Sequence, residues 1–155
     1  MPEPRDILVI EDNPADVRLI REVLRDLNPP VAIHVAGESE EALRFLRREG
    51  AHQRAPMPRI IFLDFNLPKA DARELLRTIK TDRDLCVIPV AVLTTSDAER
   101  DIREAYELHA NCYLRKPLDL DGFYQTVRAA AHFWLDVARF PAERAVEQLN
   151  KPRLL

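Results

Sequence analysis

The amino-acid sequence predicts an α/β fold, a doubly wound parallel sheet of five strands flanked by five helices. Two observations lead to this prediction. Short apolar runs alternate along the chain with segments in which apolar residues recur at helical spacing, and the connections between them are short. This alternation favours a parallel sheet covered on both faces, and the right-handedness of crossover connections leaves few topologies.

The first half of the chain contains two strand–helix units. The apolar run at residues 6–10 predicts a buried strand, and Asn13 with Pro14 predicts the cap and the first position of the following helix. A less apolar strand is expected at residues 31–36. It is followed by a helix that begins at Ser39 and ends at a glycine.

The second half of the chain contains three further units. Four consecutive apolar residues at 60–63 predict a strand buried on both faces, and the runs at 89–93 and 111–114 predict two more. Capping-box patterns mark the helices after the first two of these strands. These patterns are Asp71-x-x-Glu74 and Ser96-x-x-Glu99. The last helix is expected to run without interruption from Asp119 to Arg139.

Composition limits the class of protein. A hydrophobic content of 46% and a charged content of 32% are typical of a soluble globular protein, and 155 residues suffice for one domain. No apolar run approaches the ~20 residues that a membrane span needs. The first residues lack the apolar stretch of a signal peptide, so a cytoplasmic location is expected. The net charge of −3 without a basic block argues against a nucleic-acid-binding surface, and the two cysteines lack metal-ligand spacing.

Polar side chains follow four of the predicted strands at the point where each strand ends. They are Glu11 and Asp12, Asp64, Thr94 and Lys116. Because the carboxyl ends of parallel strands meet at one edge of a sheet, we expect these five side chains to form one cluster. Taken singly, Asp64 and Thr94 also fit ordinary strand ends, and Lys116 fits a solvated lysine.

The chemistry of this cluster suits phosphoryl transfer. Three neighbouring carboxylates raise one another's pKa values unless a positive charge is bound between them, and a pocket lined by acidic oxygens suits Mg²⁺. Lys116 supplies a point charge and Thr94 a hydroxyl for the oxygens of a phosphoryl group. Asp64, the central carboxylate, is then the candidate nucleophile, because an aspartate can accept a phosphoryl group as an acyl phosphate.

These residues resemble the receiver domain of two-component response regulators. The resemblance covers residues 6–133 and is carried by four motifs. They are Glu11-Asp12, Asp64-x-Asn66-x-Pro68, Thr94 and Lys116-Pro117. It implies a flavodoxin-like sheet with strand order 2-1-3-4-5, and it implies that Asp64 takes its phosphoryl group from a phosphohistidine of a partner histidine kinase.

The resemblance also implies a role for each residue of the site. Mg²⁺ would be bound by Asp12, Asp64 and the backbone carbonyl of Asn66, with Glu11 acting directly or through water. Lys116 would pair with the phosphoryl oxygens, and its peptide bond to Pro117 would be cis. Thr94 and Tyr113 would form a switch pair that reshapes the face made by the fourth helix, the fifth strand and the fifth helix. Tyr113 alone also fits a static core ring.

One position departs from the family's pattern. The family commonly has glycine eight residues after the phosphoacceptor, where this sequence has Ala72. If that backbone requires a positive φ, alanine would strain it or force a different turn.

The C-terminal part, residues 134–155, is predicted to be a helical extension and tail. The last helix carries two apolar stripes, one with Val127 and Trp134 and the other with Tyr124 and Leu135, and one sheet cannot bury both. We therefore expect a homodimer formed by this helix and the tail. The tail resembles that of single-domain regulators paired with phytochrome histidine kinases, which makes a bacteriophytochrome the expected kinase. A tail folded back on its own domain is the alternative.

Two other functions fit parts of the sequence. One is a pseudo-receiver that binds partners without phosphorylation, and the intact set of site residues argues against it. The other is an Mg²⁺-dependent phosphatase with an aspartate nucleophile, which would need a substrate-covering cap, whereas no insertion here exceeds a loop. No DNA-binding domain follows the receiver segment, so the expected output is a change in protein–protein contacts rather than catalysis or nucleic-acid binding.

Overall fold

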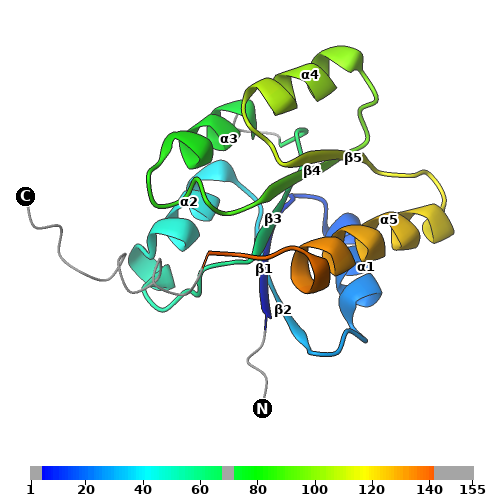
Figure 1. The fold of residues 1–155 in the computed structure, drawn as a ribbon, viewed down its shortest axis with the longest axis horizontal. Coiled ribbons are helices and arrows are strands. Elements are labelled where there is room, and N and C mark those ends of the chain that lie inside the picture. Colours follow the sequence, from blue (N-terminus) through cyan, green and yellow to red (C-terminus); the bar gives the residue numbers. More distant parts are fainter. Residues whose placement is uncertain (1–4, 68–71, 142–155) are drawn as a thin grey trace, which may run out of the picture.

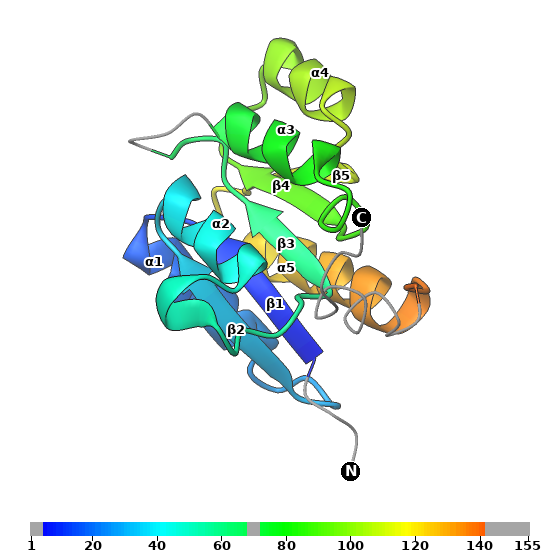
Figure 2. The same cartoon turned by 90° about the vertical axis from the view of Figure 1, so that its left-hand side faces the viewer.

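A computed structural model describes residues 5–67 and 72–141. Its centre is a parallel sheet of five strands in the order β2-β1-β3-β4-β5, which confirms the predicted fold class and order (Figures 1 and 2). The strands are β1 (Arg5–Ile10), β2 (Val31–Ala36), β3 (Ile60–Leu63), β4 (Val90–Thr94) and β5 (Cys112–Arg115). Within the described residues, no helix is both long and apolar enough to cross a membrane.

Helices cover both faces of the sheet (Figure 1). One face is covered by α1 (Pro14–Leu24) and α5 (Leu120–His132), and the other by α2 (Ser39–Arg47), α3 (Ala72–Thr81) and α4 (Glu99–Glu107). Two short helices complete the described chain, the 3₁₀-helix η1 (Gly50–His52) and the π-helix η2 (Phe133–Val137).

The core consists of two apolar layers, one on each face of the sheet. Every residue of β3 and β4 is buried, and successive residues serve opposite layers. Ile61 and Leu63 pack in the α2–α3 layer, whereas Ile60 and Phe62 pack in the α1–α5 layer. This is why the strand sequences are continuous apolar runs rather than alternating ones.

The helix starts agree with the sequence at two positions and differ at a third. The Asn13 side chain accepts a hydrogen bond from the Ala15 N–H at 2.9 Å, so the predicted cap is confirmed. The predicted start of the last helix at Asp119 is also confirmed, and its side chain accepts a hydrogen bond from the Gly122 N–H at 2.8 Å. The Ser96 capping box is wrong, because α4 begins at Glu99 and the Ser96 hydroxyl instead donates to Asp101.

The start of α3 bears on the alanine that replaces the family's glycine. Ala72 is the first residue of α3, is buried, and is not among the described residues that have a positive φ. The expected strain is therefore not seen at this position. Asp71, which was expected to cap this helix, and Pro68 lie outside the described residues.

The last helix is shorter than predicted. It ends at His132 and continues as the π-helix η2, in which the Ala138 N–H donates to the Phe133 carbonyl at 2.7 Å. The domain boundary predicted between residues 133 and 134 thus lies inside η2, and Leu135 is buried in the α1–α5 layer. The wider turn changes the direction of later side chains, and Val137 at the end of η2 is exposed.

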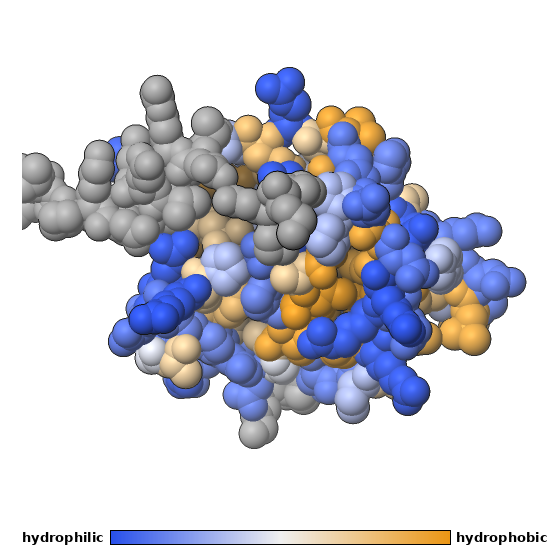
Figure 3. All heavy atoms as spheres, turned by 90° about the horizontal axis from the view of Figure 1, so that it is seen from below, coloured by the Kyte–Doolittle hydropathy of each residue, from blue (hydrophilic) through white to orange (hydrophobic). Residues whose placement is uncertain are grey.

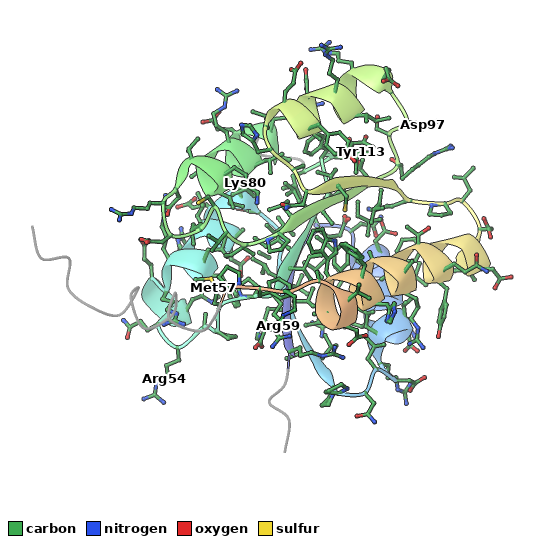
Figure 4. The ribbon with its side chains drawn as sticks, viewed as in Figure 1. Arg54, Met57, Arg59, Lys80, Asp97 and Tyr113 are labelled. Carbon is green, nitrogen blue, oxygen red and sulfur yellow. The ribbon has the colours of Figure 1, made fainter. Side chains whose placement is uncertain are left out.

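From η2 onward, the chain lies against the amino ends of β1 and β3. Arg5, at the start of β1, forms an ion pair with Asp136, and its other terminal nitrogen donates to the Pro29 carbonyl at 2.7 Å. Arg59, labelled in Figure 4 just before β3, lies over the ring of Phe140 at 5.6 Å. We call residues 133–140 the C-terminal strap.

Candidate functional site

The predicted site residues lie at the carboxyl edge of the sheet, where the strands end. Asp64 directly follows β3, and its N–H donates to the Ile10 carbonyl at 3.0 Å, beside Glu11. Lys116 directly follows β5, and its N–H donates to the Thr94 carbonyl at 2.7 Å. Backbone pairing of neighbouring strands therefore brings together residues that are distant in the sequence.

Lys116 is the centre of this site. Its side chain is 5% exposed, and its ammonium donates to Glu11 at 2.6 Å, to Asp16 at 2.8 Å and to Asp64 at 2.9 Å. An ammonium has three N–H donors, so each carboxylate takes one of them. The positive charge expected between the carboxylates is, in this structure, the lysine.

Three carboxylates form a group that can hold a metal ion. One oxygen each from Glu11, Asp12 and Asp64 lies within 4.8 Å of the other two. Glu11 and Asp64 are buried, whereas Asp12 is exposed. A few carboxylates at one open edge fit Mg²⁺ or Mn²⁺, which bind oxygen ligands and keep several waters.

Burial and charge separate the pKa values of the two buried carboxyls. Burial, helped by the hydrogen bond to Asp64, raises the pKa of Glu11 from 4.5 to about 7, although Lys116 opposes the rise. Burial acts on Asp64 in the same direction, but hydrogen bonds from Glu11, from Lys116 and from the Asn66 N–H outweigh it and lower its pKa. The proton shared by this pair therefore resides on Glu11, and Asp64 remains a carboxylate. Burial, rather than the expected repulsion between carboxylates, is thus the main cause of the raised pKa of Glu11, and Lys116 between the carboxylates helps to lower that of Asp64.

The pKa of Lys116 moves in the direction that favours its charge. Burial alone would lower this pKa, but the hydrogen bonds to Asp16, Asp64 and Glu11 raise it above its usual value. The ammonium therefore stays charged wherever Asp64 is ionised.

A second group of polar residues links the loops after β3 and β4. The Asn66 side-chain amide donates to the hydroxyl of Thr94 at 3.1 Å and to that of Thr95 at 3.3 Å. Thr94 is fully buried. The Asn66 N–H donates to Asp64 at 2.8 Å, so the same residue contacts the central carboxylate and the threonine that was predicted to respond to it.

A family comparison decides the class of protein. The sequence model of the response regulator receiver domain matches residues 7–128. The chain belongs to this family. Response regulator Rcp1 of Synechocystis sp. is 42% identical to this receiver over 139 residues, which are 90% of this chain and 95% of Rcp1. The probable methanogenesis regulatory protein FilR2 of Methanothrix harundinacea is 39% identical over 139 residues, 90% of this chain and 89% of that protein.

Solved structures agree with this assignment. The crystal structure of the phosphorylated cyanobacterial phytochrome response regulator RcpA has a TM-score of 0.87 and 43% identity, and it covers 90% of this chain and 100% of that one. The Mn²⁺-bound form of Rcp1 has a TM-score of 0.84 and 42% identity, with the same coverage. This receiver is thus a signalling module similar to a phytochrome-associated, single-domain response regulator.

The receiver's structure places most of the predicted site residues as expected and differs from the prediction at one bond. Glu11, Asp12, Asp64 and Lys116 lie together, and Asn66 and Thr94 adjoin them. The Lys116–Pro117 bond is not cis, so that prediction is wrong; within the described residues the cis bond is Asn28–Pro29. The trans bond still allows the lysine to reach all three carboxylates.

Tyr113 lies in β5 below α4, as its label in Figure 4 shows. Its hydroxyl donates to the Ser96 carbonyl at 2.9 Å, and its ring lies edge-on to Phe65 at 6.1 Å. Phe65 directly follows the central carboxylate. The tyrosine therefore contacts both the loop after β3 and the loop before α4.

Sequence reasoning missed two residues of the receiver, Asp16 and Arg73. Pro14 at the first helical position places Asp16 in the first turn of α1, and that turn lies at the same sheet edge, so the signal was present. Arg73 in α3 lies over the Phe65 ring at 4.9 Å and pairs with Asp101 and Glu104 in α4. No local sequence pattern predicts the ion pairs of Arg73, because they depend on how α3 and α4 face each other.

Proposed function

We propose that this receiver is a stand-alone phosphoacceptor switch that takes a phosphoryl group on Asp64. The observation that carries the proposal is the position of the Asp64 carboxylate. The Asp64 carboxylate, whose pKa is lowered, lies 2.9 Å from the Lys116 ammonium and has an oxygen within 4.8 Å of oxygens of Glu11 and Asp12. An ionised oxygen beside a fixed cation is suited to attack phosphorus and to stabilise the charge of the transferred group.

In the proposed reaction an Asp64 oxygen forms a bond to phosphorus. The bond between phosphorus and a histidine nitrogen of the partner kinase breaks, and its electron pair returns to the imidazole. Lys116 then pairs with phosphoryl oxygens in place of the Asp64 carboxylate, and the Thr94 hydroxyl donates to another of these oxygens.

The carboxylate group fits a divalent cation, which we propose is Mg²⁺. Asp12 and Asp64 would hold it together with the Asn66 backbone carbonyl, and Glu11 would do so directly or through water. When bound, the ion neutralises charge on the phosphoryl oxygens. Glu11 must release its proton to take part, because only a carboxylate binds the ion.

The switch would pass from Thr94 to Tyr113. If the Thr94 hydroxyl turns to the phosphoryl group, it leaves its hydrogen bond with Asn66, and the loop to Ser96 moves with it. The Tyr113 hydroxyl, which that loop now holds, is then released, and the ring changes position between β5 and α4. The face made by α4, β5 and α5 would be read by protein partners.

Incubation with acetyl phosphate and Mg²⁺ tests the central proposal. We expect one chemically labile phosphoryl group per wild-type chain, detected by intact-mass spectrometry, and none on Asp64→Asn. Continuous hydrolysis of many phosphate esters would favour an enzyme instead. If no phosphoryl donor gives an adduct, the result would favour a pseudo-receiver that binds partners without phosphorylation.

The partner is proposed to be a histidine kinase of the phytochrome type. Support comes from the phytochrome response regulator RcpA, which shares 43% of its sequence with this chain. Phosphotransfer from a purified, phosphorylated phytochrome kinase tests this proposal, with an unrelated histidine kinase as control. Equal rates with both kinases would count against a phytochrome partner.

A homodimer built on the last helix and the tail remains our proposal for assembly. Large apolar side chains are exposed along α5 and η2, namely Leu120, Tyr124, Phe133 and Val137. On the face seen in Figure 3, hydrophobic surface gathers near the centre between hydrophilic side chains. A dimeric mass for the full chain in light scattering, with a monomeric mass after truncation at Arg139, would support the dimer. A monomeric full chain, phosphorylated and unphosphorylated, would refute it.

A further inference from the structure

Asp16 contacts the central lysine from an element that contributes no other residue to the site. Its carboxylate accepts a hydrogen bond from the Lys116 ammonium at 2.8 Å, and its side chain is 24% exposed. The residue lies in the first turn of α1, which the Asn13 cap fixes next to the end of β1. Asp16 is therefore held at the rim of the pocket rather than reaching into it from a mobile loop.

The three carboxylates that contact Lys116 are not equivalent. Glu11 and Asp64 also belong to the group that can hold a cation, whereas Asp16 does not. A bound cation would engage both Glu11 and Asp64, and the phosphoryl group would be attached to Asp64. Of the three lysine contacts, only the one to Asp16 is independent of both events.

We propose that Asp16 is a positioning residue that holds the Lys116 ammonium over Asp64 while the other two carboxylates change partners. This inference rests on the proposed phosphoacceptor function and adds a residue to it. A lysine side chain has four rotatable bonds and loses considerable freedom when its amine is fixed at one place. A carboxylate that fixes the amine before the reaction removes that loss from the transition state.

The step that Asp16 supports is the formation of the acyl phosphate. With acetyl phosphate as donor, an Asp64 oxygen forms a bond to phosphorus, the bond from phosphorus to the acetyl oxygen breaks, and acetate leaves with the electron pair. Lys116 stabilises the charge on the phosphoryl oxygens during this step, and Asp16 touches only the lysine.

The test compares Asp16→Ala with Glu22→Ala in the full chain. Both variants remove one carboxylate from α1, and Glu22 is exposed, contacting only Arg25 at 3.8 Å among its described ion-pair partners. We expect the rate of acyl phosphate formation at saturating Mg²⁺ and acetyl phosphate to fall roughly tenfold in Asp16→Ala, as is typical for residues that orient a reacting group. Glu22→Ala should match the wild type.

Two further measurements separate positioning from other roles. The affinity for Mg²⁺, measured by titration calorimetry, should stay within about twofold of the wild type in Asp16→Ala, because Asp16 lies outside the cation group. The ¹H–¹⁵N signal of the Lys116 ammonium in metal-free protein should broaden in Asp16→Ala and persist in Asp16→Glu, which retains a carboxylate.

The possible outcomes distinguish failure of the positioning role from failure of the proposed function. An unchanged phosphorylation rate or an unchanged Lys116 signal in Asp16→Ala would overturn the positioning role. A roughly tenfold loss of Mg²⁺ affinity would overturn it too, because Asp16 would then act on the cation. Failure of the wild type itself to accept phosphate would instead refute the proposed function.

Discussion

At the scale of single residues, Glu11 links protonation to the state of the whole site. Its carboxyl is 4% exposed, accepts hydrogen bonds from the Asn13 N–H at 3.0 Å and from Lys116, and has a pKa raised by burial to about 7. The folded chain therefore holds a proton that the unfolded chain releases above pH 4.5. Protonated Glu11 stabilises the metal-free fold.

The sign of the resulting pH dependence follows from the raised pKa. The contribution of Glu11 is complete below pH 4.5 and is lost as the pH rises through about 7. In EDTA, the free energy of unfolding of the wild type, relative to Glu11→Gln, should fall on the order of 3 kcal/mol between pH 5 and 8. Urea denaturation of both proteins at each pH measures this difference.

The wild type and Glu11→Gln differ only at residue 11, so contributions from all other groups cancel in this comparison. Asp64 does not contribute in this range, because its lowered pKa places its effect at acidic pH. Addition of Mg²⁺ should stabilise the wild type more at pH 8 than at pH 6, since the ion competes with the Glu11 proton. A pH-independent difference between the two proteins would contradict the raised pKa.

The residues that sequence reasoning found share one property. Asp64, Thr94 and Lys116 directly follow or end strands of the sheet, so the sheet alone fixes their place. Asp16 and Arg73 lie on helices, where a side chain's neighbours depend on the rotation of the helix and on its packing. That information is absent from local patterns of polarity.

At the scale of elements, α3 and α4 are joined by one cation. Arg73 lies against Phe65 and pairs with Asp101 and Glu104, while Asp101 also accepts a hydrogen bond from Ser96. The Ser96 carbonyl in turn accepts a hydrogen bond from the hydroxyl of Tyr113, the predicted switch residue. The position of α4 is thus coupled to the loop that follows the phosphoacceptor.

We expect Arg73→Ala to loosen α4 without unfolding the protein. Hydrogen exchange of the α4 amides should quicken roughly three- to tenfold, because the helix loses its ion pairs to α3 while its apolar contact through the buried Ala105 remains. Arg103→Ala is the matched control, since Arg103 is exposed and pairs with Glu107 within α4. Equal exchange rates in the two variants would show that Arg73 does not restrain α4.

The elements were predictable where one signal dominates and not where two compete. Asn13 caps its helix as expected, and its side chain accepts hydrogen bonds from the first turn of α1. The Ser96 hydroxyl instead donates to the nearby Asp101 carboxylate, and α4 starts two residues later than the pattern indicates, with Ala98 at the cap position. The end of α5 was missed because an amphipathic stripe does not distinguish an α-helix from a π-turn at its terminus.

At the scale of the whole molecule, the C-terminal strap connects the end of the described chain to its beginning. Arg5 is 6% exposed, and Asp136 accepts hydrogen bonds from it and from His132. Burial would raise the pKa of Asp136, but the hydrogen bonds with Arg5 and His132 lower it. The strap also brings Phe140 beneath Arg59, ahead of β3.

We expect Asp136→Asn to destabilise the fold by about 1–2 kcal/mol, less than for a fully buried pair because the aspartate is partly exposed. In this variant the buried Arg5 guanidinium would keep its hydrogen bond to the Pro29 carbonyl but lose the negative charge of Asp136. Urea denaturation at neutral pH measures the effect. Asp121→Asn, an exposed acidic residue of α5, should change stability by less than about 0.5 kcal/mol. A similar loss in both variants would mean that the strap contact contributes nothing specific.

The ion pair between Arg5 and Asp136 also bears on how the chain is made. The two residues are 131 positions apart, and a ribosome adds about 5–20 residues per second. The nascent chain therefore carries Arg5 for roughly ten seconds before its counter-ion is synthesised. Until then the Arg5 guanidinium at the amino end of β1 has the Pro29 carbonyl as a partner but lacks the Asp136 carboxylate. The native contacts of β1 are therefore complete only after nearly all of the described chain has been synthesised.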